Sequence, residues 1–513
     1  MLNAKKISPF IILVIIIFAF VYYTTFLNVT KQTGLPTNWL RVIQGGEHSD
    51  GRCVAVDNTG NIYIGGYTTK YSSGDPDAFI AKLSYDGSVK WFRIIRGEKS
   101  EKIYDIAIDN ANNIYVLGST NSYSGTPGDI DFFISKLSSE GSIEWFKIIG
   151  GDKSDIGIDM AIDPLGNIFI TGETSSYGIG TQNVFVSKLA PNGSVIWFMT
   201  MDSIADIETG QSILIKEDNL YITGEVMDVL TGKLDFFIAK LNQKGSVNWF
   251  EILGNYDYDE GSVDIFCDDS GDLLVAGVQN IPPGSSSSIS LSSNIFITKL
   301  NRTGSVVWSK TLNYSFMDAI LSMEVIEQRI YIVGYIGTLK QEYIDLDIII
   351  AELNQTGSPI WSKVIESEKV ELGCDLVIEN ESNIVIAGSL YDIIGNTQAV
   401  LITKIDSETL KEVNETYFKQ IDTNQPFENV TSIRPIETSI ALNATFCSVN
   451  ISYYNPQSDS INPESDLVST SSEYYVLNSD QGGVSGYSEQ LFSSDVLRRN
   501  IVAYLKRYEL NKL

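Results

Sequence analysis

Acidic side chains recur at two fixed offsets along this sequence. One set precedes a short apolar run, at Asp50, Asp155, Glu260, Asp318 and Glu371, with Glu101, Glu208 and Glu428 in the same place in other units. The other set opens a later run, at Asp77, Asp131, Asp235 and Asp347, where Asn183, Asn294 and Gln398 take the equivalent places. Oxygen ligands that converge could bind Ca²⁺ or a cationic ligand. The alternative is that each side chain caps its own turn.

Other familiar catalytic and metal-binding sets are missing from the sequence. The single histidine, His48, can alone build neither a multi-histidine metal site nor the full set of partners needed by several familiar catalytic sites. The four cysteines lack CxxC spacing, so they form no metal motif, and isolated thiols are favoured over a Cys53–Cys447 disulfide. The remaining two are Cys267 and Cys374. We therefore predict no catalytic residues and no cofactor beyond weakly bound Ca²⁺.

The acids belong to a repeating unit, which from Cys53 to Trp91 reads CVAVDNTGNIYIGGYTTKYSSGDPDAFIAKLSYDGSVKW. Each unit has four short apolar runs separated by turns rich in Gly, Asn and Asp, which predicts four antiparallel strands. Sheets that are apolar on both faces must be covered on both sides, and repeating them around an axis achieves this. The sequence predicts an all-β fold, a β-propeller of four-stranded blades. All seven tryptophans mark the repeat: Trp39, Trp91, Trp145, Trp197, Trp249, Trp308 and Trp361.

We expect eight blades, because the two ends of the repeat region complement each other. A lone strand at Asn38–Ile43 would complete a last unit that supplies Val430–Ile436, Ser439–Asn443 and Phe446–Tyr453. Seven blades is the alternative. The third run of most units also carries a lysine, and Glu352 breaks this series. We interpret the lysines as members of ion pairs between blades. A glycine near the end of the second run is expected where the inner strands crowd together, at Gly66, Gly118, Gly172, Gly224, Gly277, Gly334 and Gly388.

The pattern VAVDxxGNIYIxGxT, then DxFIxKL, then GSVxW resembles the SBBP β-propeller repeat family of exported and surface-associated bacterial and archaeal proteins. AKLSYDGSVKW is also similar to the tryptophan-docking repeat of quinoprotein-type eight-bladed propellers, in which each Trp packs between blades. That likeness implies a structural docking role for the seven tryptophans. The vicinal cysteine pair of the quinoprotein enzymes is absent. The first family implies a surface scaffold or binding domain with no general catalytic residue set.

The flanking sequences predict a membrane-anchored protein with an exported propeller. Residues 9–27 are apolar and uncharged, long enough for a transmembrane helix, and follow two lysines in a cytoplasmic N-terminus, residues 1–8. A cleaved signal peptide is the alternative. We expect a tether at 28–36, the propeller at 37–454, a flexible linker at 455–490 and a short basic helix at 491–513. Ten Asn-X-Ser/Thr sequons agree with an exported glycoprotein.

The composition limits the partners. Sixty-four acidic residues against 36 basic ones give a formal net charge of −28, which disfavours nucleic acid. We expect a scaffold for binding, adhesion or assembly that takes a protein or glycan partner. The alternative is an exported hydrolase that acts on glycans through carboxylates in the channel mouth. Repetition argues for the scaffold, because catalytic residues should occur once and these acids recur in most units.

Overall fold

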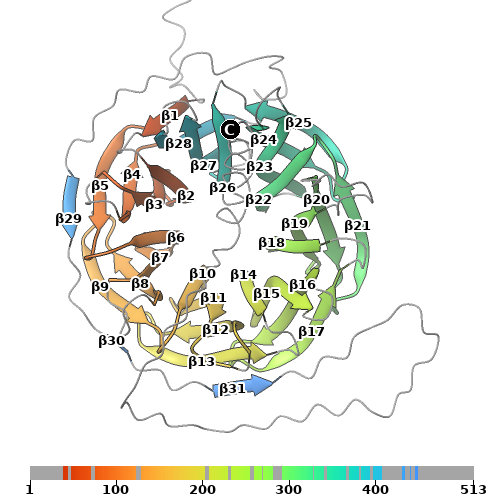
Figure 1. Cartoon of the computed structure of the whole chain (residues 1–513), viewed down its shortest axis with the longest axis horizontal. Coiled ribbons are helices and arrows are strands. Elements are labelled where there is room, and N and C mark those ends of the chain that lie inside the picture. The colour runs from red at the N-terminus through yellow and green to blue at the C-terminus, as the bar shows by residue number, and fades with distance from the viewer. Residues whose placement is uncertain are drawn as a thin grey trace, which may run out of the picture.

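The protein is a ring of β-sheets around a central axis, and all regular elements in its described residues are strands (Figure 1). The computed structural model describes residues 39–43, 48–70, 75–122, 129–178, 180–202, 207–228, 233–254, 259–268, 270–280, 292–326, 328–339, 344–365, 369–379, 383–392, 397–406, 430–433, 439–440 and 445–448. These residues form seven four-stranded antiparallel blades.

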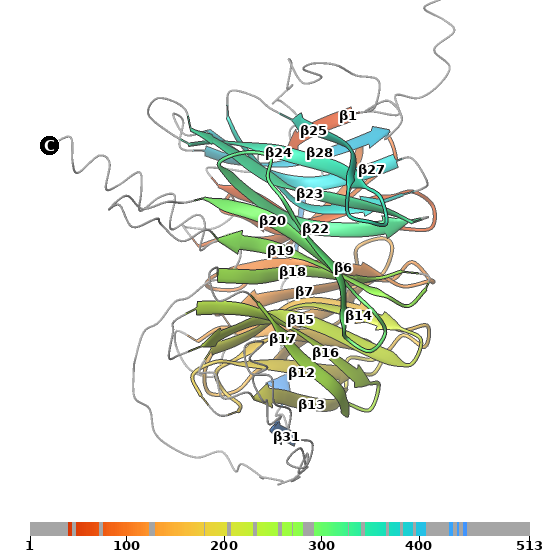
Figure 2. The ribbon, with the colours of Figure 1, turned by 90° about the vertical axis from the view of Figure 1, so that its right-hand side faces the viewer.

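The strands run from one face of the ring to the other (Figure 2). In blades 1 to 6 the inner strand comes first in the chain, whereas in blade 7 the outer strand comes from the N-terminal end of the repeat region. The blades, in order, are β2 (Ser49–Val56), β3 (Ile62–Thr68), β4 (Asp77–Leu83), β5 (Val89–Ile95); β6 (Glu101–Ile108), β7 (Ile114–Thr120), β8 (Asp131–Leu137), β9 (Ile143–Ile149); β10 (Asp155–Ile162), β11 (Ile168–Thr174), β12 (Asn183–Leu189), β13 (Val195–Asp202); β14 (Ile207–Lys216), β15 (Asn219–Asp228), β16 (Lys233–Asn242), β17 (Val247–Leu253); β18 (Asp259–Cys267), β19 (Leu273–Asn280), β20 (Ser293–Leu300), β21 (Val306–Leu312); β22 (Met317–Ile326), β23 (Arg329–Leu339), β24 (Ile344–Leu353), β25 (Pro359–Ile365); and β26 (Val370–Ile378), β27 (Asn383–Asp392), β28 (Thr397–Asp406), β1 (Trp39–Ile43).

The prediction of eight blades is wrong. β1 pairs antiparallel with β28, with Trp39 opposite Lys404 and Ile43 opposite Val400, so the N-terminal strand completes the seventh blade. The C-terminal runs form no eighth blade. They add instead as single parallel strands outside blades 1, 2 and 3: β29 (Val430–Ile433) on β5, β30 (Ser439–Ile440) on β9 and β31 (Thr445–Ser448) on β13.

The glycines of the second strands sit where the first strand bulges. The register of β2 against β3 shifts between Gly51 and Cys53, and the other six blades shift at the equivalent place. A Cβ at Gly66 would lie 1.8 Å from the Asp50 carbonyl oxygen, and one at Gly388 would lie 2.0 Å from that of Leu372. The prediction of crowding at these glycines is confirmed, because a side chain would overlap the bulged inner strand.

The core lies between blades. One cluster joins Ile64 and Phe79 of blade 1 to Val385 and Ile402 of blade 7, and the other interfaces are filled in the same way. Apolar residues on both faces of each strand therefore bury one face against each neighbouring blade, as a closed ring requires.

Tryptophans of the outer strands contact the next blade. The Trp39 indole Nε1 donates to the Tyr85 carbonyl oxygen at 3.0 Å, and Trp91, Trp145 and Trp197 make equivalent bonds to Ser139, Pro191 and Gln243. Each indole lies over the glycine of the β-turn that follows, as Trp39 does at Gly87, where a Cβ would lie 2.9 Å from the ring. Gly87 also has a φ of 79°, which favours glycine.

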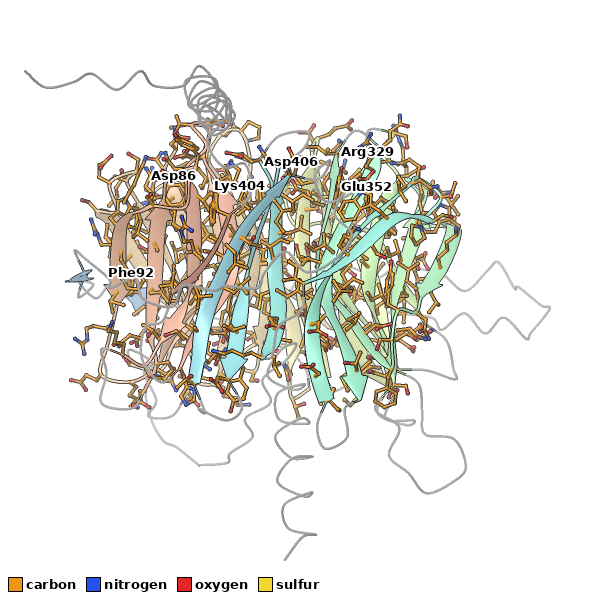
Figure 3. The ribbon with its side chains drawn as sticks, turned by 90° about the horizontal axis from the view of Figure 1, so that it is seen from above. Asp86, Phe92, Arg329, Glu352, Lys404 and Asp406 are labelled. Carbon is orange, nitrogen blue, oxygen red and sulfur yellow. The ribbon has the colours of Figure 1, made fainter. Side chains whose placement is uncertain are left out.

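Trp361 differs because its blade is followed by blade 7, in which the two ends of the repeat region meet. We call this meeting point the seam. The outer strand of blade 7 is β1, from the other end of the chain, so no β-hairpin joins it to β28. The Trp361 Nε1 donates instead to Glu352 Oε2 in its own blade at 2.6 Å, and Glu352 Oε1 lies 3.5 Å from Arg329 (Figure 3). Glu352 therefore interrupts the lysine series at the blade before the seam.

In the described part of the chain, the ion pairs of Lys82, Lys136, Lys299 and Lys404 lie within one blade, which corrects the interpretation as pairs between blades. Lys299 Nζ lies 2.8 Å from Asp268 Oδ2 and Lys136 Nζ lies 3.2 Å from Glu144, both within one blade. Contact with the next blade is a hydrogen bond to the backbone, as from Lys82 Nζ to the Ser139 oxygen at 3.0 Å.

Several predicted segments lie outside the described residues. They are the cytoplasmic N-terminus, the anchor, the tether, the linker and the basic helix. Within the described part of the chain, no helix is long and apolar enough to span a membrane.

Candidate functional site

The two faces of the ring differ in their connections. On one, here called the turn face, the first-to-second and third-to-fourth strand connections have two to five residues, as at 217–218 and 57–61. On the opposite loop face, the second-to-third connections vary from 4 residues (340–343) to 12 (281–292). Blades 1, 2, 3 and 5 have the four longest, at 69–76, 121–130, 175–182 and 281–292. Variation in loop length is thus concentrated on the loop face, where both predicted acidic sets lie.

The acids that open the first strands are buried inside the loops that precede them. Glu101 accepts hydrogen bonds from the Gly97 amide at 2.6 Å and the Thr120 hydroxyl at 2.9 Å. Asp155 accepts from the Gly151 amide at 2.7 Å. Asp318 accepts from the amides of Tyr314 and Ser315 at 2.6 and 3.0 Å. These carboxylates hold the loop that enters each blade.

The remaining members of this set have other partners. The Ser389 hydroxyl of blade 7 donates to Asp50, whose other oxygen lies 3.3 Å from Arg52 Nε. Gln279 donates to Glu260 at 2.5 Å. Glu371 is 1 % exposed. The structure thus places all five predicted acids on one face, buried in separate blades.

The second predicted set is also enclosed. Asp77, Asp131 and Asp347 are buried, and Asp235 is partly buried. Arg96 Nε lies 3.9 Å from Asp77 Oδ2. Burial, together with the charge of Asp155, raises the pKa of Asp131 to about 7. Within the described residues, no group of three or more His, Cys, Asp or Glu side chains is arranged to hold a metal ion. Cation binding by these residues stays a prediction.

A ring of acids on the innermost strands was not predicted from the sequence. The residue that follows the bulge is Asp105, Asp159, Asp264 or Asp375 in blades 2, 3, 5 and 7. Each accepts a hydrogen bond through Oδ2 from a backbone amide of the next blade, from Met160 (3.0 Å), Ile213 (2.7 Å), Met323 (2.8 Å) and Val54 (2.8 Å). The sequence contains a signal for this ring, because each of these four aspartates lies four residues after an acid that opens a first strand. Those acids are Glu101, Asp155, Glu260 and Glu371.

Serines complete this inner ring where the aspartate is missing. Ser212 of blade 4 donates to Asp264 Oδ1 at 3.1 Å, and Ser322 of blade 6 donates to Asp375 Oδ1 at 2.9 Å. Blade 1 has Cys53 in this place, with a free, buried thiol. Cys267 and Cys374 are also free, so the described structure has no disulfide at Cys53. The inner ring ties successive blades together around the axis.

The inner-ring carboxyls retain protons more readily than free carboxyls do. Each of these four side chains is partly buried on the innermost strand of its blade. This burial raises the pKa of Asp264 to about 7 and that of Asp375 to about 6, in spite of the bonds they accept. It also raises the pKa values of Asp105 and Asp159, whose carboxyls interact with each other.

A second group of buried carboxyls lies on the loop face of blades 3 and 4. Glu173 of β11 accepts a hydrogen bond from Gln182, and burial raises its pKa to about 8. Burial raises the pKa of Glu225 on β15 to about 7. The negative charges of Glu225 and Asp155 act on Glu173 in the same direction. Like Asp131, these groups have the chemistry of a general acid, because they hold a proton near neutral pH.

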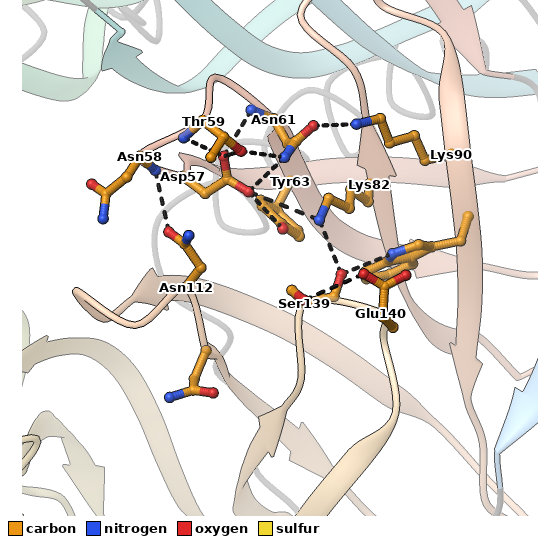
Figure 4. A network of polar contacts seen from close by, with 12 residues as sticks. Asp57, Asn58, Thr59, Asn61, Tyr63, Lys82, Lys90, Asn112, Ser139 and Glu140 are labelled. Carbon is orange, nitrogen blue, oxygen red and sulfur yellow. Dashed lines mark hydrogen bonds and ion pairs between the residues drawn. The ribbon is translucent and has the colours of Figure 1, made fainter.

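The turn face carries a structural network instead (Figure 4). Asp57 accepts bonds from the Asn61 side chain at 2.8 Å, the Thr59 amide at 2.9 Å and the Tyr63 hydroxyl at 3.0 Å. Burial alone would raise the pKa of Asp57, but the bonds from Asn61 and Thr59 outweigh it and lower the pKa to about 2. Asp109 and Asp163 bind their turns in the same way. This network shapes the turn.

Two segments, residues 91–125 and 144–180, match the family model of the SBBP β-propeller repeat. The chain carries SBBP repeats. The matched residues fall in blades 1 to 3 and include Asp105, Asp155 and Asp159 of the sets described above. The SBBP resemblance is thus confirmed, whereas no comparison supports the quinoprotein-like detail.

The other comparisons with known proteins assign no activity to this chain. An uncharacterized WD repeat-containing protein of Acanthamoeba polyphaga mimivirus is 27% identical over 176 residues, and the match spans 13% of that protein and 27% of this chain. A polysaccharide lyase of family PL25, an ulvan lyase, has a TM-score of 0.49 at 11% identity, covering 73% of this chain and all of that one. A phage phi92 endosialidase has a TM-score of 0.42 at 10% identity, covering 87% of this chain and 80% of that one. Identities this low indicate neither a shared substrate nor shared site residues for the SBBP propeller.

Proposed function

We propose that this SBBP propeller is an exported, membrane-anchored scaffold that binds a protein or glycan through its loop face. The observation that carries the proposal is that loop length varies mainly on this face, from 4 to 12 residues, while the turns opposite stay between two and five. Loops of varied length on a rigid scaffold are where proteins place recognition. The recurring carboxyls support the same function, because they are used to hold loops and blades.

The position of β1 supports this orientation. Its first residue, Trp39, lies opposite Lys404 at the turn face, so the chain enters the ring from that side. Only residues 28–38 separate the expected anchor from β1. Eleven extended residues span at most about 40 Å. The turn face would therefore lie toward the membrane, and the loop face would point outward to a partner.

The test is a glycan array and a protein-binding screen with the full chain in detergent. Replacing residues 281–292 by a four-residue connection such as 340–343 should abolish binding of whatever ligand the parent protein retains, because the longest loop is lost. The matched control is Leu165→Ser, a change at a residue 80% exposed on the turn face, which should leave binding unchanged. Binding that survives the shortened loop but disappears in Leu165→Ser would refute the assignment of the face.

The membrane anchor has its own test. The full chain should sediment with membranes after carbonate washing, and a variant without residues 1–36 should remain in the supernatant. A glycosidase that shifts the mass of the protein would support use of the sequons in an exported compartment. Recovery of the intact chain in the soluble fraction would contradict the anchor.

A second candidate function rests on Glu173 and Glu225. Two neighbouring carboxyls that hold protons near pH 7 could supply the general acid of a glycan hydrolase. Release of reducing ends from polysaccharides by the full chain, lost in both Glu173→Gln and Glu225→Gln, would establish this alternative. No release with either the parent protein or the variants is expected for a scaffold.

A further inference from the structure

The outer strands of blades 1 to 6 fall into two sequence classes. Around the tryptophan, β5, β9, β13 and β17 read WFRII, WFKII, WFMTM and WFEIL, whereas β21 and β25 read WSKTL and WSKVI. The first class therefore has an aromatic ring next to the tryptophan. The second class has a serine there.

Three strands of the first class are already paired on their outer edge. β29 lies parallel to β5 from Phe92 to Ile95, β30 pairs with β9 at Ile148 and Ile149, and β31 pairs with β13 from Met199 to Asp202. Figure 1 shows these strands outside blades 1, 2 and 3. The rim of this propeller thus accepts parallel strands from its own chain.

Phe250 of β17 is the one member of the aromatic set that stays partly exposed. Its ring stacks on Phe237 at 5.0 Å between centroids, as Phe92 stacks on Phe79 (5.2 Å), Phe146 on Phe133 (5.0 Å) and Phe198 on Phe185 (5.1 Å). The inner contacts are therefore equivalent in four blades. Phe92, Phe146 and Phe198 are nevertheless 1%, 5% and 1% exposed, while Phe250 and Ile252 are only partly buried. Because the inner contacts are equivalent, the difference in exposed fraction must come from what lies outside each outer strand.

The path of the chain indicates what covers this edge. From residue 430 to residue 448 it passes blades 1, 2 and 3 in order, with connections of five residues (434–438) and four (441–444). Blade 4 is next in that direction. A connection of the same length after Ser448 would begin the next strand at about residue 453, in the sequence Tyr-Tyr-Asn. We propose that the segment beginning at Tyr453 adds to β17 as a fourth parallel rim strand and covers Phe250.

The second class of outer strands, which has serine after the tryptophan, explains why no further rim strand would add beyond blade 4. In β21 and β25 the equivalents of Phe250 are Ser309 and Ser362, both exposed, each followed by a lysine. Serine and lysine on an exposed edge discourage strand addition, whereas an unpaired edge with Phe and Ile invites it. The inference concerns β17 and does not depend on the partner proposed for the loop face.

Hydrogen exchange on the full chain tests the proposal. Amides of β17 should exchange as slowly as those of β13 and slower than those of β21. Replacing Tyr453 and Tyr454 by proline removes two amides of the added strand and should accelerate exchange in β17 by about tenfold or more, with β13 unchanged. The control, Ser469→Pro with Thr470→Pro, changes the same tail outside the proposed strand. Equal exchange of β17 in both double variants, or exchange of parental β17 as fast as that of β21, would overturn the proposal.

Disulfide trapping identifies the occupant. In a Cys447→Ser background, Glu251→Cys with Tyr454→Cys should form a bond within one chain, read as a monomer on a non-reducing gel and by peptide mass. Lys310→Cys with Tyr454→Cys places the thiol at the equivalent position of blade 5 and should not. A bond only between chains would show that a second copy covers β17. A bond that forms more readily in the Lys310→Cys variant than in the Glu251→Cys variant would place the segment on blade 5. Either result contradicts the proposal.

Discussion

The Asp375 Oδ2 atom accepts a hydrogen bond of 2.8 Å from the Val54 amide, a residue 321 positions away in the chain. This bond joins the last blade to the first on the inner side of the ring. Its Oδ1 also accepts from the Leu376 amide at 2.8 Å and the Ser322 hydroxyl at 2.9 Å. One carboxyl thus connects blades 6, 7 and 1.

Asp375→Ala should lower the free energy of unfolding by about 2–4 kcal/mol, because buried donors of three residues lose their acceptor. Asp375→Asn should cost less, since the amide oxygen can still accept from Val54. Denaturant titration followed by tryptophan fluorescence gives both values. Equal stability of the alanine variant and the parent would show that the inner ring does not hold the seam.

Stability should decrease between pH 5 and pH 8. The folded-state pKa values of Asp264, Glu225, Glu173 and Glu324, about 7, 7, 8 and 8, lie above the ordinary values of 3.8 for Asp and 4.5 for Glu. The folded state therefore binds more protons than the unfolded state in this window, and the stability contributed by these groups is lost as pH rises through their folded pKa values. Below about pH 4 the lowered pKa of Asp57 acts in the opposite sense.

Scanning calorimetry at fixed ionic strength should give a melting temperature several degrees higher at pH 5 than at pH 8. The double variant Glu173→Gln with Glu225→Gln should flatten the slope, because the amides do not titrate. A melting temperature that increases steadily from pH 5 to pH 8 is the opposite of what we expect.

The seam strand should be needed for closure. Deleting Pro36–Gly46 removes β1 and exposes the edge of β28, which should lower the melting temperature and cause association seen by size exclusion. Trp39→Ala alone should cost about 3–5 kcal/mol, because the Trp39 ring is buried against Gly87 of blade 1. Trp361→Ala is the matched control and should cost less, since its indole is partly exposed and bonds within its own blade. Intact elution and melting of the deleted protein would contradict closure by β1.

Calcium should bind the loop face weakly, if the acids that open the first strands can exchange a loop donor for a cation. Titration with Ca²⁺ to millimolar concentration should then raise the melting temperature, because a ligand that prefers the folded state stabilises it. The triple variant Asp50→Asn, Asp155→Asn and Asp318→Asn should lose that rise. No rise in the melting temperature of the parent, or an equal rise in the variant, would show that these carboxylates hold the loops and do not bind Ca²⁺.

The repeat predicted the blade but not the count of blades. Cys53–Trp91 contains the whole local pattern, and the crowding at Gly66 follows from it. The strand of Trp39–Ile43, in contrast, has the sequence of any outer strand and could complete any last blade. The runs near Val430 and Phe446 look like inner strands, yet they pair with β5 and β13, a choice made by long-range contacts that local patterns do not contain.

The sequence predicted that the acids of the candidate site converge, and their role in binding stays a prediction. The offsets placed Asp50 and Asp155 together on one face, but offsets do not reveal the loop amides and hydroxyls that enclose them. The inner ring was missed because Asp105 lies inside an apolar run, where alternation suggests a strand residue and a bulge cannot be seen. Glu352 was visible in the sequence as a break in the lysine series, but only the structure relates that break to the hydrogen bond from Trp361.

The Thr403 hydroxyl donates to the Trp39 carbonyl oxygen across 364 residues of sequence. The first strand to leave the ribosome is therefore the last to find its partner. At synthesis rates of 5–20 residues per second, β1 waits on the order of half a minute before β28 exists. Until then this strand must stay unpaired, or pair transiently, while six blades assemble behind it. Ring closure should accordingly be the slow step of folding, and chaperones should act on the open ring.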